Sequence, residues 1–258
     1  MNTLQKIISY KLDELAHRKR KFPLGDVQKK TQDAKPAVHF LKNFRKEKIN
    51  LICEIKKASP ALGVIRDDFN PVDIAHIYEA HGANAISVLT DEHFFQGSLQ
   101  FLIDIKKVAK LPCLRKDFTL SEYHIYEARG AGADAILLIA AALDDYQLKD
   151  YQALAVDLGM MSLIEVHDIA EAKRLIPLNC SLVGVNNRNL ATFETNLKVS
   201  EEVFPYLGMK STKTSESGIK TAKDIKNLKE IGYDAFLVGE ALMREKDIGE
   251  KLKELKHK

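Results

Sequence analysis

Ionisable or amide side chains stand at the ends of six short, mostly apolar segments of this 258-residue chain. They are Glu54 and Lys56, Lys116, Glu165, Asn186, Glu216, and Glu240. A protonated lysine can donate a proton to an oxygen that gains negative charge, and a carboxylate can stabilise a cation or accept a proton. Glu54 and Lys56 are two residues apart, so on a strand they would share a face, where burying them is costly unless they are paired or used. A set of this size predicts a reaction site rather than solvated surface charges.

Two glycine-containing turns follow the last two of these segments. Ser217-Gly218 follows the seventh segment of the chain, where we expect Gly218 to open a helix, and Gly239-Glu240 follows the eighth. Backbone N–H groups at helix N-termini bind phosphate well. We therefore expect a phosphate dianion at these two turns, with the Glu240 carboxylate turned away so that only its N–H donates.

The segments that carry these residues have the length and the regular spacing of strands. Their expected bounds are 51–55, 85–89, 113–115, 135–140, 161–166, 182–185, about 210–215 and 235–238. The seventh is polar and is predicted from its place in the repeat, not from its hydrophobicity. Amphipathic stretches between the segments predict helices at 71–81, 122–130, 168–175 and 221–231. Gly132, Gly159 and Gly232 stand where a helix-to-strand turn favours a left-handed residue.

Eight strand–helix units in succession predict an α/β fold, a single (β/α)8 TIM barrel with its chemistry at the C-terminal ends of the strands. We expect one domain over residues 1–258, with residues 1–49 as an N-terminal helical extension. Apolar residues at helical spacing predict the first helix of this extension: Leu4, Ile7, Ile8, Leu12 and Leu15. A second, short helix is expected at 37–46. Neither GxGxxG nor GxxxxGK[ST] follows a strand, so nucleotide-binding folds lack their usual support.

Composition narrows the class of protein further. The net charge is +3, from 39 basic and 36 acidic residues mixed along the chain, so we expect no nucleic-acid partner. No apolar run approaches the about 18 residues of a membrane span, and the N-terminus lacks a signal-peptide core, so we expect a cytoplasmic protein with no membrane partner. Cys53, Cys113 and Cys180 lie in apolar runs and are expected to be buried free thiols. The histidines lack metal-ligand spacing, so no metal site is expected.

Taken together, the strand-end motifs resemble those of the indole-3-glycerol-phosphate synthases. The matching motifs cover nearly the whole chain in order: Glu54-Ile-Lys56-Lys57-Ala-Ser59-Pro60, Leu89-Thr90-Asp91, Phe95-Gln-Gly97-Ser98, Leu114-Arg-Lys116-Asp117-Phe118, Glu165-Val-His167, Asn186-Asn-Arg188-Asn-Leu190, Ser215-Glu216-Ser217-Gly218 and Val238-Gly239-Glu240. One departure is Ala61-Leu62, where the family usually has Ser-Lys. This departure predicts weaker ordering of the first loop, or weaker contacts near the phosphate.

The resemblance implies a carboxy-lyase of tryptophan biosynthesis. Its reaction closes a ring in 1-(2-carboxyphenylamino)-1-deoxyribulose 5-phosphate, with loss of carbon dioxide and water, to give indole-3-glycerol phosphate. It implies Lys116 as the general acid at the ketone. Lys56 is the second candidate for that role and is also a candidate for holding the substrate carboxylate or phosphate. Glu165 would stabilise the cationic intermediate and then act in the dehydration. The resemblance gives orienting roles to three more residues: Glu54, Asn186 and Glu216.

The binding residues are likewise implied by the resemblance. An apolar pocket for the aryl ring would be formed by Phe95, Phe118, Leu137 and Leu190. Phosphate would be bound by Ser59, Ser217, Gly218, Gly239 and Glu240, and Arg188 completes the substrate-binding set. No cofactor is expected, because ring closure itself creates a cation beside the departing carboxylate. We expect a monomer whose partner is the small phosphorylated substrate.

Two other interpretations compete with this one. A phosphosugar isomerase on a similar barrel, such as phosphoribosylanthranilate isomerase, needs an acid and a base on opposite faces of the substrate, often a Cys or an Asp. Cys53 is expected to point away from the face of Glu54, into the barrel wall, and an isomerase would leave Lys116 and Glu165 without a role. A barrel that only binds a phosphorylated ligand predicts tight binding without product. Turnover of the two enzyme substrates separates these interpretations.

Overall fold

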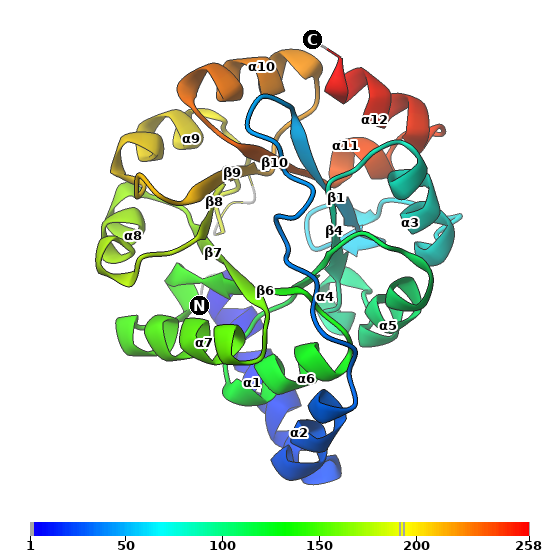
Figure 1. Ribbon diagram of the computed structural model, residues 1–258, viewed down its shortest axis with the longest axis vertical. Helices are drawn as coiled ribbons and strands as arrows, with labels where there is room; N and C mark the ends of the chain where they lie inside the picture. The colour runs from blue at the N-terminus through cyan, green and yellow to red at the C-terminus, as the bar shows by residue number, and fades with distance from the viewer. Residues whose placement is uncertain (1–2, 191, 193, 258) are drawn as a thin grey trace.

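The computed structural model describes residues 3–190, 192 and 194–257, and it contains a closed barrel of eight parallel strands (Figure 1). The strands follow one another around the barrel in chain order: β1 (Asn50–Ile55), β4 (Ala85–Leu89), β5 (Cys113–Lys116), β6 (Ala135–Ile139), β7 (Met161–Val166), β8 (Leu182–Asn186), β9 (Thr212–Glu216) and β10 (Ala235–Val238). β10 pairs with β1 and closes the ring. The predicted TIM barrel is therefore confirmed.

The polar strand β9 is held by its neighbours rather than by its own hydrophobicity. It pairs in parallel with β8 on one side, with Asn186 opposite Glu216, and with β10 on the other. The hydroxyl of Ser215 is buried against the helix layer, where it accepts a hydrogen bond from Asn187 Nδ2 at 3.0 Å and lies 2.8 Å from Ser200 Oγ. The hydroxyl of Ser215 is thus paired, whereas Thr214 Oγ1 and the two oxygens of Glu216 on the same strand have no hydrogen-bond partner among the described residues.

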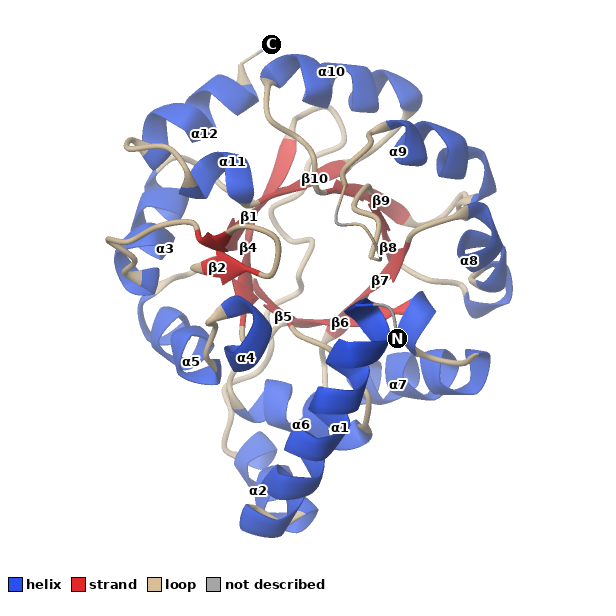
Figure 2. Ribbon diagram, turned by 180° about the vertical axis from the view of Figure 1, so that it is seen from behind, coloured by secondary structure: helices blue, strands red, loops and turns tan. Residues whose placement is uncertain are grey.

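Helices form a ring around the barrel, as Figure 2 shows. They are α3 (Pro71–Ala80), α4 (Glu92–Phe95), α5 (Leu99–Val108), α6 (Glu122–Gly130), α7 (Asp145–Asp157), α8 (Ile169–Arg174), α9 (Lys198–Val203), α10 (Ala222–Ile231), α11 (Glu240–Met243) and α12 (Ile248–Lys256). Side chains alternate along each strand, so that on β1 Cys53 packs in the apolar layer under the helices while Ile52 fills the barrel interior. All three cysteines are buried and free, as predicted, and Cys53 points into the barrel wall.

The N-terminal extension reaches both ends of the barrel. Helix α1 (Thr3–Lys21) lies over the face seen in Figure 2, and α2 (Leu24–Gln32) leads back to the opposite face. The segment between α2 and β1 then crosses the barrel, as Figure 1 shows. Phe40 in that segment is fully buried and belongs to the same apolar cluster as Leu4 and Ile7 of α1, together with residues of the barrel interior.

The short helix expected at 37–46 is wrong, and α2 was not predicted. Residues 40–43 form turns, because tertiary hydrogen bonds take up the polar groups of this segment. The Val38 N–H donates to Asp134 Oδ1 at 2.7 Å, and Asn43 Nδ2 donates to the Asn84 carbonyl at 3.2 Å. Sequence periodicity cannot detect such long-range partners.

A β-hairpin that the sequence did not reveal folds over the barrel mouth. It consists of β2 (Ala58–Ser59) and β3 (Gly63–Val64), which pair antiparallel.

The three glycines predicted at left-handed turns, Gly132, Gly159 and Gly232, all have positive φ. The expectation for Gly218 is wrong: α10 begins at Ala222, with Thr221 as its N-cap.

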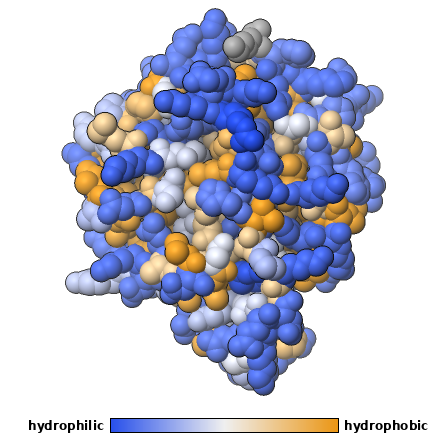
Figure 3. All heavy atoms as spheres, viewed as in Figure 1, coloured by the Kyte–Doolittle hydropathy of each residue, from blue (hydrophilic) through white to orange (hydrophobic). Residues whose placement is uncertain are grey.

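The outer surface is mixed in character. Figure 3 shows hydrophilic side chains over much of the face in view, with apolar residues scattered between them. Among the described residues, the structure has no helix both long and apolar enough to cross a membrane.

Candidate active site

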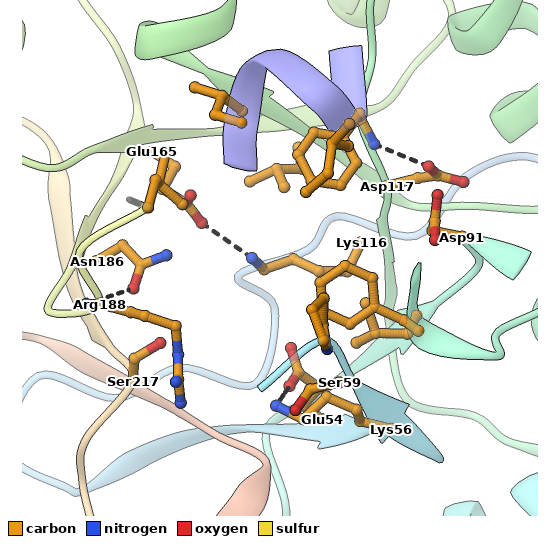
Figure 4. A pocket seen from close by; sticks show the side chains of 18 residues that line it. Glu54, Lys56, Ser59, Asp91, Lys116, Asp117, Glu165, Asn186, Arg188 and Ser217 are labelled. Carbon is orange, nitrogen blue, oxygen red and sulfur yellow. Dashed lines mark hydrogen bonds and ion pairs between the residues drawn. The ribbon is translucent and has the colours of Figure 1, made fainter. Parts of the chain in front are cut away.

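Two adjoining cavities occupy the C-terminal mouth of the barrel. The first is lined by most of the predicted site residues, several of which Figure 4 labels: Glu54, Lys56, Ser59, Phe95, Lys116, Phe118, Leu137, Glu165, Asn186, Arg188, Leu190 and Ser217. The second is lined by the remaining four, Glu216, Gly218, Gly239 and Glu240. The two cavities share Glu54, Lys56, Lys116, Arg188 and Ser217. The structure thus brings every predicted site residue to one mouth.

The predicted catalytic charges form one group, which we call the mouth cluster: Glu54, Lys56, Lys116, Glu165 and Glu216. Lys116 Nζ lies 2.9 Å from Glu165 Oε2 and 3.5 Å from Glu216 Oε2. Lys56 Nζ lies 2.7 Å from Glu54 Oε1. In Figure 4 the Lys116 and Glu165 side chains point toward each other across the cavity.

Burial and charge act in opposite directions on the pKa values of this cluster. Burial by itself would lower the pKa of Lys116, but the carboxylates of Glu165, Glu216 and Glu54 outweigh it and raise that pKa. Burial would raise the pKa of Glu165, but the neighbouring Lys116 and His167 hold it well below its usual range. Lys116 is therefore an ammonium and Glu165 a carboxylate at neutral pH, as an acid and a cation-stabilising group require.

Glu216 differs from Glu165. Burial is the main reason that the pKa of Glu216 rises to about 8, and although Lys116 lowers it, the charges of Glu165 and Glu54 raise it further. Neither of its oxygens has a hydrogen-bond partner within the described part of the chain. Glu216 is thus the member of the pair whose pKa is raised, whereas the pKa of Glu165 is lowered.

Glycines on the neighbouring strands make room for these carboxylates inside the barrel. A Cβ atom at Gly184 of β8 would collide with Glu216 Oε1, and one at Gly239 would collide with Glu54 Oε1. Any larger residue at either position would therefore displace a member of the mouth cluster. The sequence analysis assigned no role to Gly184.

The apolar side of the first cavity receives residues from helix α1. Leu4 and Ile7 line it beside Phe118, Leu137 and Leu190. Sequence reasoning missed both as site residues, although they are the first members of the apolar face that predicted α1. Their position shows that the extension forms part of the wall of the mouth.

Strand β5 also carries charges on its other face. Five residues form what we call the peripheral network: Lys11, Arg18, Arg115, Asp117 and Glu127. Lys11 Nζ lies 3.0 Å from Asp117 Oδ1, and Arg115 Nη2 lies 2.7 Å from Glu127 Oε2. Arg18 Nη1 lies 2.9 Å from Glu127 Oε1. The network ties α1 to β5 and α6 directly behind Lys116.

The loops expected to bind phosphate lie together at the second cavity. Gly239 precedes the short helix α11, whereas Ser217 and Gly218 both have left-handed backbones, with φ of 66° and 79°, and lie in the loop before α10. The Glu240 carboxylate is held by Arg244 at 3.0 Å and by Arg188 at 3.3 Å. These arginines neutralise the charge that would otherwise repel a phosphate.

His167 directly follows β7 and contacts Glu165, and no role was predicted for it. Its Nε2 lies 3.2 Å from Glu165 Oε1, and its Nδ1 lies 3.1 Å from Glu171 Oε2. The signal in the sequence was its position two residues after Glu165, on the same side of the strand end. Among the described residues, no three or more His, Cys, Asp or Glu are grouped to hold a metal ion.

Comparison with known proteins agrees with this geometry. The family model described as indole-3-glycerol phosphate synthase matches residues 4–255. The indole-3-glycerol phosphate synthase of Alkaliphilus metalliredigens is 45% identical, over 98% of this chain and 97% of the relative. That of Dehalococcoides mccartyi is also 45% identical, over 98% of this chain and 99% of the relative.

Solved structures of other proteins have a similar fold. The tryptophan synthase A-subunit from Pyrococcus furiosus aligns with a TM-score of 0.60 over 82% of this chain and 98% of its own, at 13% identity. At that identity the likeness shows the barrel fold alone. The family model and the relatives, which match the chain along nearly its whole length, carry the assignment: the chain belongs to the indole-3-glycerol phosphate synthase family.

Proposed function

We propose that the mouth cluster carries out a cofactor-independent ring closure as a carboxy-lyase, with 1-(2-carboxyphenylamino)-1-deoxyribulose 5-phosphate as substrate. The observation that supports this most is the position of Lys116. Its ammonium is held between two carboxyl groups, with the apolar wall on one side and the glycine loops on the other. A substrate with an aryl ring at one end and a phosphate at the other would span both cavities, with its ketone beside Lys116.

The first step forms a bond between the aryl carbon and the ketone carbon. As this bond forms, Lys116 gives its proton to the ketone oxygen, and the ring becomes a cation that Glu165 stabilises. The bond to the ring carboxylate then breaks, its electron pair neutralises the cation, and carbon dioxide leaves. No separate electron sink is required, because the ring itself accepts the electrons.

The second stage removes water. Glu165 takes a proton from the ring while an ammonium protonates the departing hydroxyl group: Lys56, or Lys116 once it has taken up a proton from water. Glu54 holds Lys56, and Asn186 and Glu216 would orient the sugar hydroxyls. Asn186 Oδ1 itself accepts a hydrogen bond from the Arg188 N–H at 3.0 Å, which fixes its amide group at the cavity.

The test is a fluorescence assay. Mixing the protein with the carboxyphenylamino substrate, without metal or cofactor, should produce the fluorescence of the indole product. Phosphoribosylanthranilate, the substrate of the competing isomerase, should not turn over. A folded protein that gives no indole signal would contradict the proposal.

We also propose that the enzyme acts as a monomer, which sedimentation at assay concentration would test.

A further inference from the structure

Glu165 and Glu216 compete for the same cation and cannot both be ionised cheaply. Both are buried, both face Lys116, and like charges at this separation raise each other's pKa. Such a pair titrates as a unit, so some further feature must decide which member keeps the proton. The proposed chemistry requires an ionised Glu165, because a protonated one could neither stabilise a cation nor take a proton from the ring.

The two carboxyl groups differ in the neighbours beyond Lys116. Glu165 Oε2 accepts a hydrogen bond from Lys116 at 2.9 Å. Its other oxygen lies 3.2 Å from His167 Nε2, an ion-pair contact that does not have the geometry of a hydrogen bond. Glu216 has Lys116 at 3.5 Å and no hydrogen-bond donor among the described residues. His167 therefore breaks the equivalence of the pair.

His167 is itself held in place from the other side. Its Nδ1 and its backbone N–H both lie against Glu171 Oε2, at 3.1 Å and 2.8 Å. Glu171 in turn belongs to the first turn of α8, where its N–H donates to the N-cap residue Asp168 at 2.8 Å. The imidazole is thus fixed between two carboxylates, the buried Glu165 and the partly exposed Glu171.

We propose that His167, held by Glu171, is a positioning residue that makes Glu165 the ionised member and Glu216 the protonated member of the pair. The inference rests on the proposed role of Glu165 in catalysis. Burial would lower the pKa of His167, but the two carboxylates raise it to about 9, so the ring carries a positive charge at neutral pH. An imidazolium on one carboxylate and none on the other separates two otherwise similar acids.

Infrared difference spectroscopy tests this assignment without substrate. A buried protonated carboxyl group gives a carbonyl-stretch band at neutral pH. Aspartate variants keep both carboxyl groups of the pair, so the band should shift in frequency in Glu216→Asp and stay in place in Glu165→Asp. A band that shifts in Glu165→Asp and stays in place in Glu216→Asp would overturn the proposal. Because no turnover is measured, this result stands apart from any failure of the proposed reaction.

The effect of His167 is tested by His167→Gln, which keeps an N–H donor but loses the charge. We expect the acidic limb of kcat/KM to move to higher pH by about one unit or more, because Glu165 then binds its proton more tightly. At pH 7, above this limb, kcat and KM should stay within about twofold of the parent, so that the loss of activity is confined to acidic pH. Glu171→Gln should shift the limb in the same direction by less.

His81→Gln is the matched control. His81 lies at the end of α3, where its Nδ1 contacts the Ile77 carbonyl at 2.8 Å, and it does not line the mouth. It should leave the pH profile unchanged. A merely structural role of His167 would lower activity equally at every pH, and an unmoved acidic limb in His167→Gln would refute the positioning role.

Discussion

Two charge clusters, the mouth cluster and the peripheral network, meet at strand β5. Both consist of buried acidic and basic side chains, but they differ in how completely those side chains are paired. Lys116 belongs to the mouth cluster, whereas its neighbours in sequence, Arg115 and Asp117, pair with each other at 3.3 Å in the peripheral network, although Asp117 also lines the first cavity. In the peripheral network each oxygen of Glu127 has its own arginine, at 2.9 Å and 2.7 Å. In the mouth cluster Glu216 has no hydrogen-bond donor among the described residues. One cluster is complete without a ligand and the other is not.

The pKa values express the same difference. Burial would raise the pKa of Asp117, but Lys11 and Arg115 hold it well below its usual range. Burial raises the pKa of Glu216 to about 8, and Lys116 offsets that rise only in part. A buried charge in this chain is therefore stable only where oppositely charged side chains pair with it completely. Where the pairing is incomplete, as at Glu216, the carboxyl group can exchange a proton near neutral pH.

Replacing Lys116 by methionine should produce the largest effect. We expect kcat to fall by at least a hundredfold, in line with general-acid contributions of about 10²–10⁴, because among the described residues Lys116 is the lysine paired with Glu165. Steady-state fluorescence kinetics would measure it. Lys107→Met, which removes an exposed cation paired with Asp104, is the control and should keep full activity. Turnover near that of the parent would move the acid role to Lys56.

Replacing Arg115 by methionine should mainly affect folding. The change leaves Glu127 and Asp117 buried without their shared cation, which typically costs about 3–5 kcal/mol in the free energy of unfolding. Urea denaturation followed by circular dichroism would measure the loss. Lys253→Met, which breaks an exposed ion pair with Glu250, should change the midpoint little. Equal losses in the two variants would show that the peripheral network does not stabilise the fold.

Glu216→Gln should change how stability depends on pH. The folded-state pKa of Glu216, about 8, is above the unfolded value, so the folded protein binds its proton more tightly. The parent should therefore lose stability as pH rises from about 4.5 to about 8, and this loss should be absent from the variant. Urea midpoints from pH 5 to pH 9 would compare the two proteins. Parallel curves would mean that Glu216 is ionised throughout.

Restoring the usual family residues in the hairpin loop, with Ala61→Ser and Leu62→Lys together, should have the smallest effect. Leu62 is 40% exposed, and both residues line a surface hollow beside Gly218 and Glu240. An added cation there should lower KM for the phosphorylated substrate by about two- to fivefold at low salt, and by less at high salt, with kcat unchanged. An unchanged KM at low salt would show that the loop does not reach the phosphate.

The sequence predicts most of the barrel because each strand repeats a simple pattern of buried residues between turns. Even the polar β9 is found, since its place in the repeat is fixed by its neighbours. The helix expected at 37–46 fails for the opposite reason, because the partners of that segment, such as Asp134, are about 100 residues away.

The same distinction between local sequence pattern and long-range contact applies to the candidate site. Lys116, Glu165 and Glu216 are predicted because each ends a strand of the barrel. The roles of His167 and Leu4 are not, because they depend on contacts with Glu165 and with the barrel mouth that only the folded chain creates.

The N-terminal extension sets the order in which this chain can assemble. During synthesis its residues emerge first, and their partners follow at different times. The partners of α1 on β5 and α6 emerge early, whereas Phe40 belongs to the same apolar cluster as Leu182 and Leu237, which emerge late. Contacts across such separations form slowly, so this apolar cluster stays incomplete until they do. A chain shortened before β10 would keep the ion pairs of α1 but would leave the cluster around Phe40 without Leu237.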